Sequence, residues 1–161
     1  MEFSPNWSAA AMAAIICLIA AFVESRLSGE DLAKWLQSLR RPRYFAPLFV
    51  WVLAAVLTYI LQGIIAYRLI AHADAPYRIP ALIVLVAIMA GNIAYNMVLD
   101  RTRDPRWAYW GLLWFLPLLL SLQIVLLFAD PFSAWLNLLY LVWVAGYDLP
   151  VMRALAKRNA A

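Results

Sequence analysis

Apolar residues run along this chain in five long, nearly uninterrupted stretches separated by short polar segments. The stretches cover roughly residues 7–24, 46–69, 79–99, 107–128 and 131–152. A helix needs about 20 apolar residues to cross the hydrocarbon core of a bilayer, so each stretch can form one membrane span. The strands of a membrane barrel instead alternate apolar and polar residues over about 10 positions. The pattern therefore predicts an all-α membrane protein, a single domain over residues 1–161 built from a bundle of five transmembrane helices.

The first stretch also has features of a secretory signal peptide, since the residues between Ala9 and Ala21 are mostly small and apolar. A signal peptide begins with basic residues, whereas this chain has Glu2 and no lysine or arginine before Arg26. We interpret the stretch as a retained helix. Cys17, the only cysteine, lies in its middle, which excludes an intrachain disulfide and favours a packing role.

The connection between the first two spans carries two structural signals. Residues 28–31 read Ser-Gly-Glu-Asp and are typical of the cap of a short amphipathic helix at the membrane interface. Pro42 and Pro47 restrict the backbone before the second span, so we expect a shaped loop there. The other connections are short, which makes consecutive spans antiparallel neighbours.

Composition supports the membrane assignment, and the placement of charge orients the chain. Hydrophobic residues make up 66% of the sequence and charged residues 14%, with a mean hydropathy of +0.78. Soluble domains are about half apolar and a quarter charged. Of the 13 basic residues, all except Arg68 and Arg78 flank the spans on one side. Because basic residues concentrate in cytoplasmic loops, we predict an integral protein of a bacterial cell membrane with the N-terminus outside and the C-terminus in the cytoplasm.

Few polar residues interrupt the spans, and each is costly to leave unpaired in lipid. Asn92 and Asn96 lie four residues apart and share one face of the third span. They either form hydrogen bonds between helices or face the polar group of a ligand. Asp148 lies about one turn from the cytoplasmic end of the last span, where it either reaches water or pairs with a loop arginine.

Aromatic residues gather on two of the spans. Tyr140, Trp143 and Tyr147 follow one another at spacings of three and four, which places them on one face of the fifth span. Packing and pocket lining both remain open for this group. Trp107 and Trp110 begin the fourth span, where tryptophan is typical of the membrane interface.

Enzymatic chemistry is not expected from these residues. His72, the only histidine, falls in an outer loop. Neither a metal cluster nor a Ser/His/Asp or Cys/His set can therefore form at membrane depth. Nucleic acid is also not an expected partner, because the basic residues orient the protein and contact anionic lipid.

Several motifs keep a common register with one family of membrane proteins. Its pattern reads approximately W-x3-L-x-K-P-x-W-x-P-P and then L-Y-x3-G-x2-A, and the residues that keep the register are Trp35, Leu39, Arg41, Pro42, Tyr44, Pro47, Tyr59, Gly63 and Ala66. Arg41 stands for the lysine of this pattern, Tyr44 for its second tryptophan and Ala46 for one of its prolines. The register continues through Q-x3-N in the third span and P-Y-L-x-W in the fifth, at Asn92, Asn96, Leu139, Tyr140, Leu141 and Trp143. Asn92 stands for the glutamine, and Leu139 stands for the proline. On these motifs the sequence resembles the TspO/MBR family, which comprises tryptophan-rich sensory proteins and the translocator protein, or peripheral-type benzodiazepine receptor. Two family tryptophans are replaced here, by Ala55 and Leu99.

The resemblance implies a five-helix bundle, often a homodimer, that binds porphyrins, haem and sterol-like ligands beneath the first loop. Carried over position by position, it implies ligand-binding roles for Trp35, Pro42, Tyr59, Gly63, Asn92, Asn96, Tyr140 and Trp143. Helical facing adds Trp51 and Tyr147 to these candidates.

We therefore predict a non-enzymatic receptor or carrier for a planar hydrophobic ligand, with a tetrapyrrole or sterol-like molecule and membrane lipid as partners. No cofactor is required, and porphyrin or haem enters only as a ligand. One alternative is an assembly or regulatory subunit of a membrane complex that binds no ligand. The enzymatic alternative, implied by the same resemblance, is porphyrin photodegradation, an activity attributed in the family to paired tryptophans.

Overall fold

A computed structural model describes residues 6–27, 31–72 and 74–159, and within them every regular element is a helix. Five helical segments are long and apolar enough to cross a membrane: α1 (Trp7–Leu27), α3 (Leu48–Ala71), α4 (Arg78–Thr102), α5 (Pro105–Ala129) and the continuous run Pro131–Arg158. That run joins α6 (Pro131–Trp143), the π-helical turn η1 (Val144–Asp148) and α7 (Leu149–Arg158). The predicted all-α, five-span fold is confirmed.

The short helix α2 (Asp31–Ser38) precedes the second span, at the position where the amphipathic pattern predicts it. Three of the four residues of its predicted cap, 28–30, lie outside the described residues. The last span continues to Arg158, beyond the predicted end at residue 152, because α7 still buries apolar side chains such as Val151 and Leu155.

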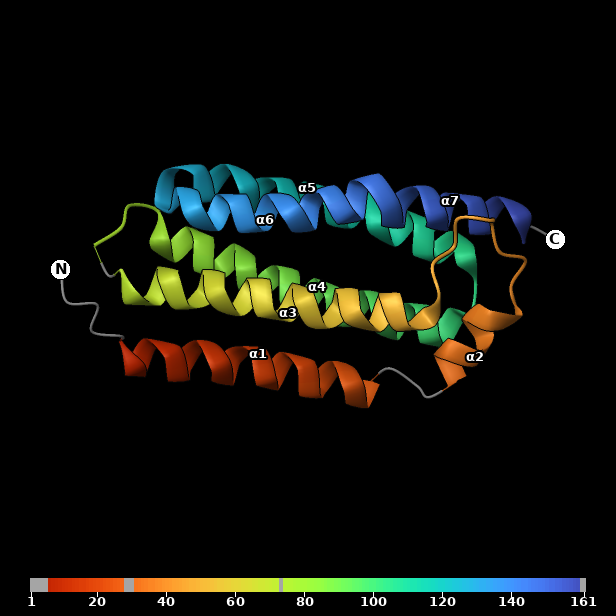
Figure 1. Ribbon diagram of the computed structural model, residues 1–161, viewed down its shortest axis with the longest axis horizontal. Helices are drawn as coiled ribbons and strands as arrows, with labels where there is room; N and C mark the ends of the chain where they lie inside the picture. Colours follow the sequence, from red (N-terminus) through yellow and green to blue (C-terminus); the bar gives the residue numbers. More distant parts are fainter. Residues whose placement is uncertain (1–5, 28–30, 73, 160–161) are drawn as a thin grey trace.

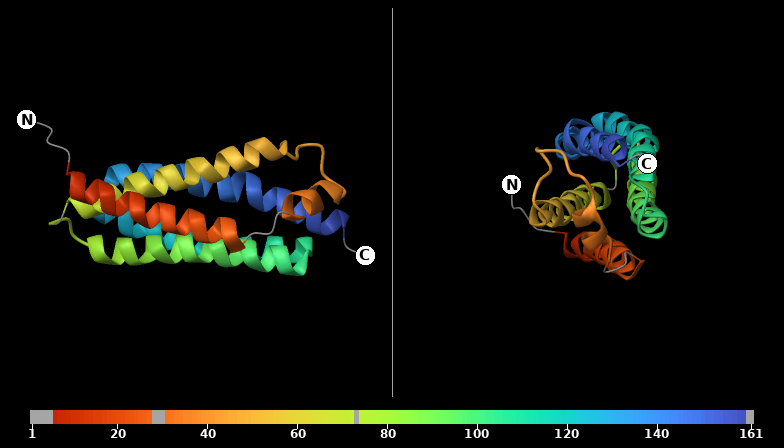
Figure 2. Two further views of the ribbon diagram at one scale, coloured as in Figure 1. Left: turned by 90° about the horizontal axis from the view of Figure 1, so that it is seen from below. Right: turned by 90° about the vertical axis from the view of Figure 1, so that its right-hand side faces the viewer.

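The spans lie side by side in an elongated bundle with α1 at one edge (Figure 1). There α1 packs against α3 and α4, while α5 packs against α4 and against both parts of the last span. The two views in Figure 2 show α2 and the loop after it at one end of the bundle, together with the end of α7. The segments that carry most of the basic residues therefore meet at this end of the bundle. That this end faces the cytoplasm stays a prediction.

The outer surface of the bundle is apolar, as expected for helices that face lipid. Trp114 is 81% exposed and Trp135 is 69% exposed, and many large aliphatic side chains also point outward. A contiguous apolar surface of this size marks a membrane-facing region in a helical protein. Small residues such as Ala9 and Ala13 are buried and allow α1 to approach its neighbours closely.

An ion pair closes the end of the bundle opposite α2. The Arg68 Nε and Nη2 atoms donate to the two carboxylate oxygens of Asp130 at 2.6 and 2.9 Å. Asp130 also accepts hydrogen bonds from the backbone N–H and the hydroxyl of Ser133. Asp130 is thereby the N-cap of α6. The Arg68 guanidinium lowers the pKa of the Asp130 carboxyl to about 2. The bidentate pair ties α3 to the turn between α5 and α6.

The π-helical turn η1 follows from a proline in the last span. The Leu149 N–H donates to the Val144 carbonyl, five residues back instead of four. Pro150 has no N–H, and in a regular helix its ring would collide with the carbonyl of Gly146. The extra residue in the turn relieves this collision and shifts the facing of the residues around Asp148.

Candidate functional site

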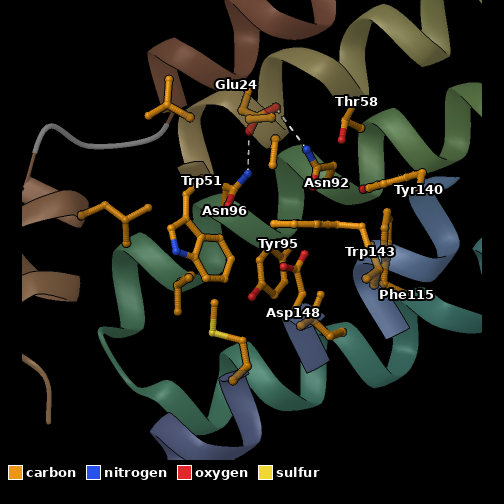
Figure 3. A pocket seen from close by; sticks show the side chains of 18 of the residues that line it. Glu24, Trp51, Thr58, Asn92, Tyr95, Asn96, Phe115, Tyr140, Trp143 and Asp148 are labelled. Carbon is orange, nitrogen blue, oxygen red and sulfur yellow. Dashed lines mark hydrogen bonds between the residues drawn. The ribbon is translucent and has the colours of Figure 1, made fainter. Parts of the chain in front are cut away.

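A cavity of about 290 Å³ opens inside the bundle beneath α2, with walls from α1, α3, α4, α5 and the last span (Figure 3). Its walls are mostly aliphatic and aromatic, with a few polar groups. The lining residues are Glu24, Leu32, Leu36, Trp51, Val52, Ala54, Ala55, Thr58, Asn92, Tyr95, Asn96, Leu99, Leu112, Phe115, Tyr140, Trp143, Val144, Asp148 and Met152.

One polar group in the cavity wall is a carboxylate held by three donors. Glu24 of α1 accepts a hydrogen bond from the Tyr59 hydroxyl of α3. It also accepts from the side-chain amides of Asn92 at 3.2 Å and Asn96 at 2.6 Å, both on α4 (Figure 3). Three donors thus converge on the two carboxyl oxygens of Glu24. The cluster joins three helices around one acidic side chain.

A second carboxylate reaches the cavity from the other side. Asp148 lies at the end of η1, and Figure 3 shows its side chain directed into the cavity from the last span. Its Oδ1 atom and the hydroxyl of Tyr95 are buried and have no hydrogen-bond partner among the described residues. No ion pair to Glu24 or Asp148 is found in the described part of the chain. Buried polar atoms without partners are rare in native proteins and call for an explanation.

Aromatic rings give the cavity rigid, flat walls. The ring centroids of Phe115 and Tyr140 lie 6.4 Å apart in an edge-to-face arrangement. The ring centroid of Tyr147 lies 5.7 Å from that of Trp51 and 4.7 Å from that of Trp143. Trp51, Tyr140 and Trp143 face the cavity, and Tyr147 supports two of these rings from behind.

Five of the ten predicted ligand-binding residues line the cavity: Trp51, Asn92, Asn96, Tyr140 and Trp143. They come from α3, α4 and the last span, which the fold brings together. The two asparagines also satisfy the other interpretation of their spacing, because both donate to Glu24 across a helix interface. Their role in ligand binding stays a prediction.

The other five predicted residues support the cavity without being among its described lining residues. Trp35 packs against the hydrophobic core, while Leu32 and Leu36 of the same helix cover the cavity instead. Pro42 is buried, and its carbonyl accepts from the Phe45 N–H in the loop after α2.

Tyr59, Gly63 and Tyr147 have equally definite structural contacts. Tyr59 donates to Glu24. Gly63 faces α1, where an added Cβ atom would lie 3.4 Å from the Cys17 sulfur. The Tyr147 hydroxyl accepts from the Ala46 N–H at 2.7 Å and donates to the Tyr44 carbonyl at 3.0 Å. Tyr147 thus fastens the loop after α2 to the last span.

Sequence reasoning did not identify Glu24, Tyr95 or Phe115 as cavity residues. Glu24 is an acid in an otherwise apolar segment, and this was the available signal. The first span was taken to end at that residue, however, whereas α1 continues to Leu27. Asp148 was expected to reach water or pair with a loop arginine, and the described residues provide no such pair.

The two positions at which family tryptophans are replaced also lie in the cavity. Ala55 and Leu99 both belong to its lining. A smaller side chain leaves more room in the space between the helices, so these two replacements shape the cavity directly.

The fold and the cavity define an integral membrane protein, a bundle of five spans with an aromatic-walled internal pocket. The sequence matches the model of the TspO/MBR family over residues 13–147, and the chain belongs to this family. No curated protein sequence matches the chain.

Proposed function

We propose that the protein is a non-enzymatic membrane receptor or carrier that binds a planar hydrophobic molecule, a tetrapyrrole or sterol-like compound, under α2. The cavity itself carries this proposal. Small-molecule pockets typically have volumes of about 300–1,000 Å³ and apolar walls with a few polar groups. The cavity, at about 290 Å³, lies just below the lower end of that range and has the same character. Its aromatic faces suit a flat ring system.

Charge near the entrance supports a tetrapyrrole among the planar ligands. Leu32 and Leu36 of α2 cover the cavity, and the loop after α2 carries Arg40, Arg41 and Arg43. Guanidinium groups pair well with carboxylates. A porphyrin with its ring system in the cavity could extend its propionates toward these arginines.

Titration of the purified protein with protoporphyrin IX, haem and a sterol in the dark tests the proposal through tryptophan fluorescence. We expect saturable quenching by at least one of the three. Trp143→Ala should weaken the affinity about tenfold or more, because the indole forms part of the cavity wall. Trp135→Ala is the matched control, since this exposed tryptophan of the same span faces away from the cavity. Unchanged affinity in a folded Trp143→Ala protein would refute binding in this cavity.

A second candidate function is an assembly or regulatory subunit that binds no ligand. The cluster around Glu24 favours it, because the protein's own side chains already use the hydrogen bonds of Asn92 and Asn96. These amides are then structural links between α1 and α4 instead of anchors for a ligand. Absence of quenching by all three compounds at micromolar concentrations would support this second function.

A further inference from the structure

The cavity combines aromatic walls with two carboxylates and has no basic residue among its described lining residues. Glu24 approaches from α1 and Asp148 from η1 (Figure 3). Acidic side chains inside membrane spans are rare, and they normally pair with one another, with other polar groups or with a substrate. This composition is unusual for a pocket whose only task is to hold a neutral apolar molecule.

The two carboxylates differ in how the protein satisfies them. Glu24 accepts hydrogen bonds from Tyr59, Asn92 and Asn96, all of which are neutral donors. None of these donors carries a positive charge. Asp148 keeps one buried oxygen without any partner, and so does the Tyr95 hydroxyl in the same cavity.

The unpartnered atoms specify what an occupant must supply. The Asp148 Oδ1 atom needs a hydrogen-bond donor, and a charged donor would also balance the carboxylate. The Tyr95 hydroxyl can accept from the same donor group. The remaining walls offer the faces of Trp51, Trp143 and Tyr140, which attract cations.

We propose that the cavity recognises an organic cation, a ligand whose flat apolar body carries a protonated amine placed between Asp148, Tyr95 and the surrounding rings. The inference rests on the proposed function, because it assumes that the cavity binds a ligand, and it specifies the charge of the buried part. An anionic group in the same place would face two carboxylates, and the described residues that line the cavity include no basic side chain. A metal ion is disfavoured, since the described residues contain no group of three His, Cys, Asp or Glu side chains that could hold one.

Three probes that share one ring system separate charge from shape. They are 9-(aminomethyl)anthracene, 9-methylanthracene and anthracene-9-carboxylate, which are cationic, neutral and anionic at neutral pH. The full chain is placed in nanodiscs of phosphatidylcholine, and binding is followed by energy transfer from tryptophan to anthracene. We expect the cation to bind at least tenfold more tightly than the neutral probe, and the anion to bind least.

Substitutions assign this preference to the cavity. Asp148→Asn should weaken binding of the cation at least tenfold and change the affinity of the neutral probe less than twofold. Tyr95→Phe should weaken binding of the cationic probe about threefold. The substitution removes only a hydroxyl that has no partner in the described structure. Asp74→Asn is the matched control, because it removes one negative charge from an exposed loop at the other end of the bundle.

The possible results distinguish this inference from the proposed function. If the three probes bind with affinities within twofold, or if the anion binds best, the cavity holds apolar ligands without selecting a cation and only this inference fails. If Asp74→Asn weakens binding of the cationic probe as much as Asp148→Asn does, the preference for the cation comes from the overall charge of the protein, and the inference also fails. If no probe binds and the porphyrins and sterol also fail to quench, the proposed function fails with it.

Discussion

Two aspartates, one directly before the last span and one within it, illustrate two different uses of an acid in a membrane protein. Asp130, directly before the span, accepts hydrogen bonds from the Nε and Nη2 atoms of Arg68 and two further ones from Ser133. Asp148, at the π-helical turn within the span, has a buried oxygen without a partner among the described residues and faces a cavity. The first is fully engaged with the protein, and its contribution is structural. The second keeps one oxygen that no described residue satisfies, which is the property expected of a residue that meets a ligand.

Removing the partner of Asp130 should have the largest effect on stability. The Asp130 side chain is 14% exposed and the Arg68 side chain 30% exposed. Arg68→Ala therefore leaves a mostly buried carboxylate without its cationic partner. The cost lies between that of surface and buried ion pairs, so we expect a loss of about 2 kcal/mol in the free energy of unfolding. Thermal unfolding in detergent measures it. A loss below about 0.5 kcal/mol would show that the pair is incidental to the fold.

A substitution beside the cavity should combine a smaller loss of stability with a loss of binding. A Cβ atom at Gly111 would lie 2.6 Å from the Tyr95 ring, which would have to move. Such overpacking costs about 1–3 kcal/mol, and we expect the lower end for Gly111→Ala because the ring can shift into the cavity. Ligand affinity should fall about tenfold. Gly146→Ala is the matched control, since nothing lies within 4 Å of its added Cβ atom.

Acid should weaken the Asp130 region over a defined pH range. The pKa of Asp130 is lowered from 3.8 to about 2, chiefly by the hydrogen bond from Arg68. The folded state therefore binds this proton less readily than the unfolded state, and the stabilisation, complete above about pH 4, is lost as the pH falls through 2. Melting temperatures recorded from pH 5 to about pH 2 should fall for the native chain and fall less for Asp130→Asn. Parallel curves for the two proteins would contradict the assignment.

The smallest expected effect is on the stability of the chain without a ligand after Asp148→Asn. Asp148 makes no ion pair in the described structure, and one of its oxygens has no hydrogen-bond partner. Removing its charge therefore breaks no ion pair in the described structure. We expect the free energy of unfolding to change by less than about 0.5 kcal/mol or to increase. A loss above about 1 kcal/mol would mean that Asp148 holds the fold together, as Asp130 does.

Hydrophobic runs were sufficient to predict the five spans, because each must satisfy its backbone within a helix about 20 residues long. The facing of individual side chains was harder to predict. The resemblance implies a ligand-binding role for Trp35, which stays a prediction, and the described residues of the same helix that line the cavity are Leu32 and Leu36. The orientation of a short helix is set by tertiary contacts that its own sequence does not contain.

The polar part of the site shows the same limit. The spacing of Asn92 and Asn96 correctly placed both on one helix face, but their partner Glu24 lies on another helix, 68 and 72 positions away in the sequence. The position of Asp148 depends on the π-helical turn before Pro150, which interrupts the regular period used to assign faces. Long-range partners and local irregularities therefore decided what periodicity alone left open.

Protection of a cysteine in the cavity tests most directly whether a ligand binds there. In a Cys17→Ser background, Ala55→Cys places a thiol in the cavity wall, and Asp74→Cys places one in an exposed loop at the other end of the bundle. Protoporphyrin IX and 9-(aminomethyl)anthracene are added at concentrations up to the highest soluble level, and the rate of modification by a small methanethiosulfonate is measured. We predict that at least one of them slows modification of Ala55→Cys tenfold or more and leaves Asp74→Cys unaffected. Equal rates with and without both compounds at Ala55→Cys would contradict the account.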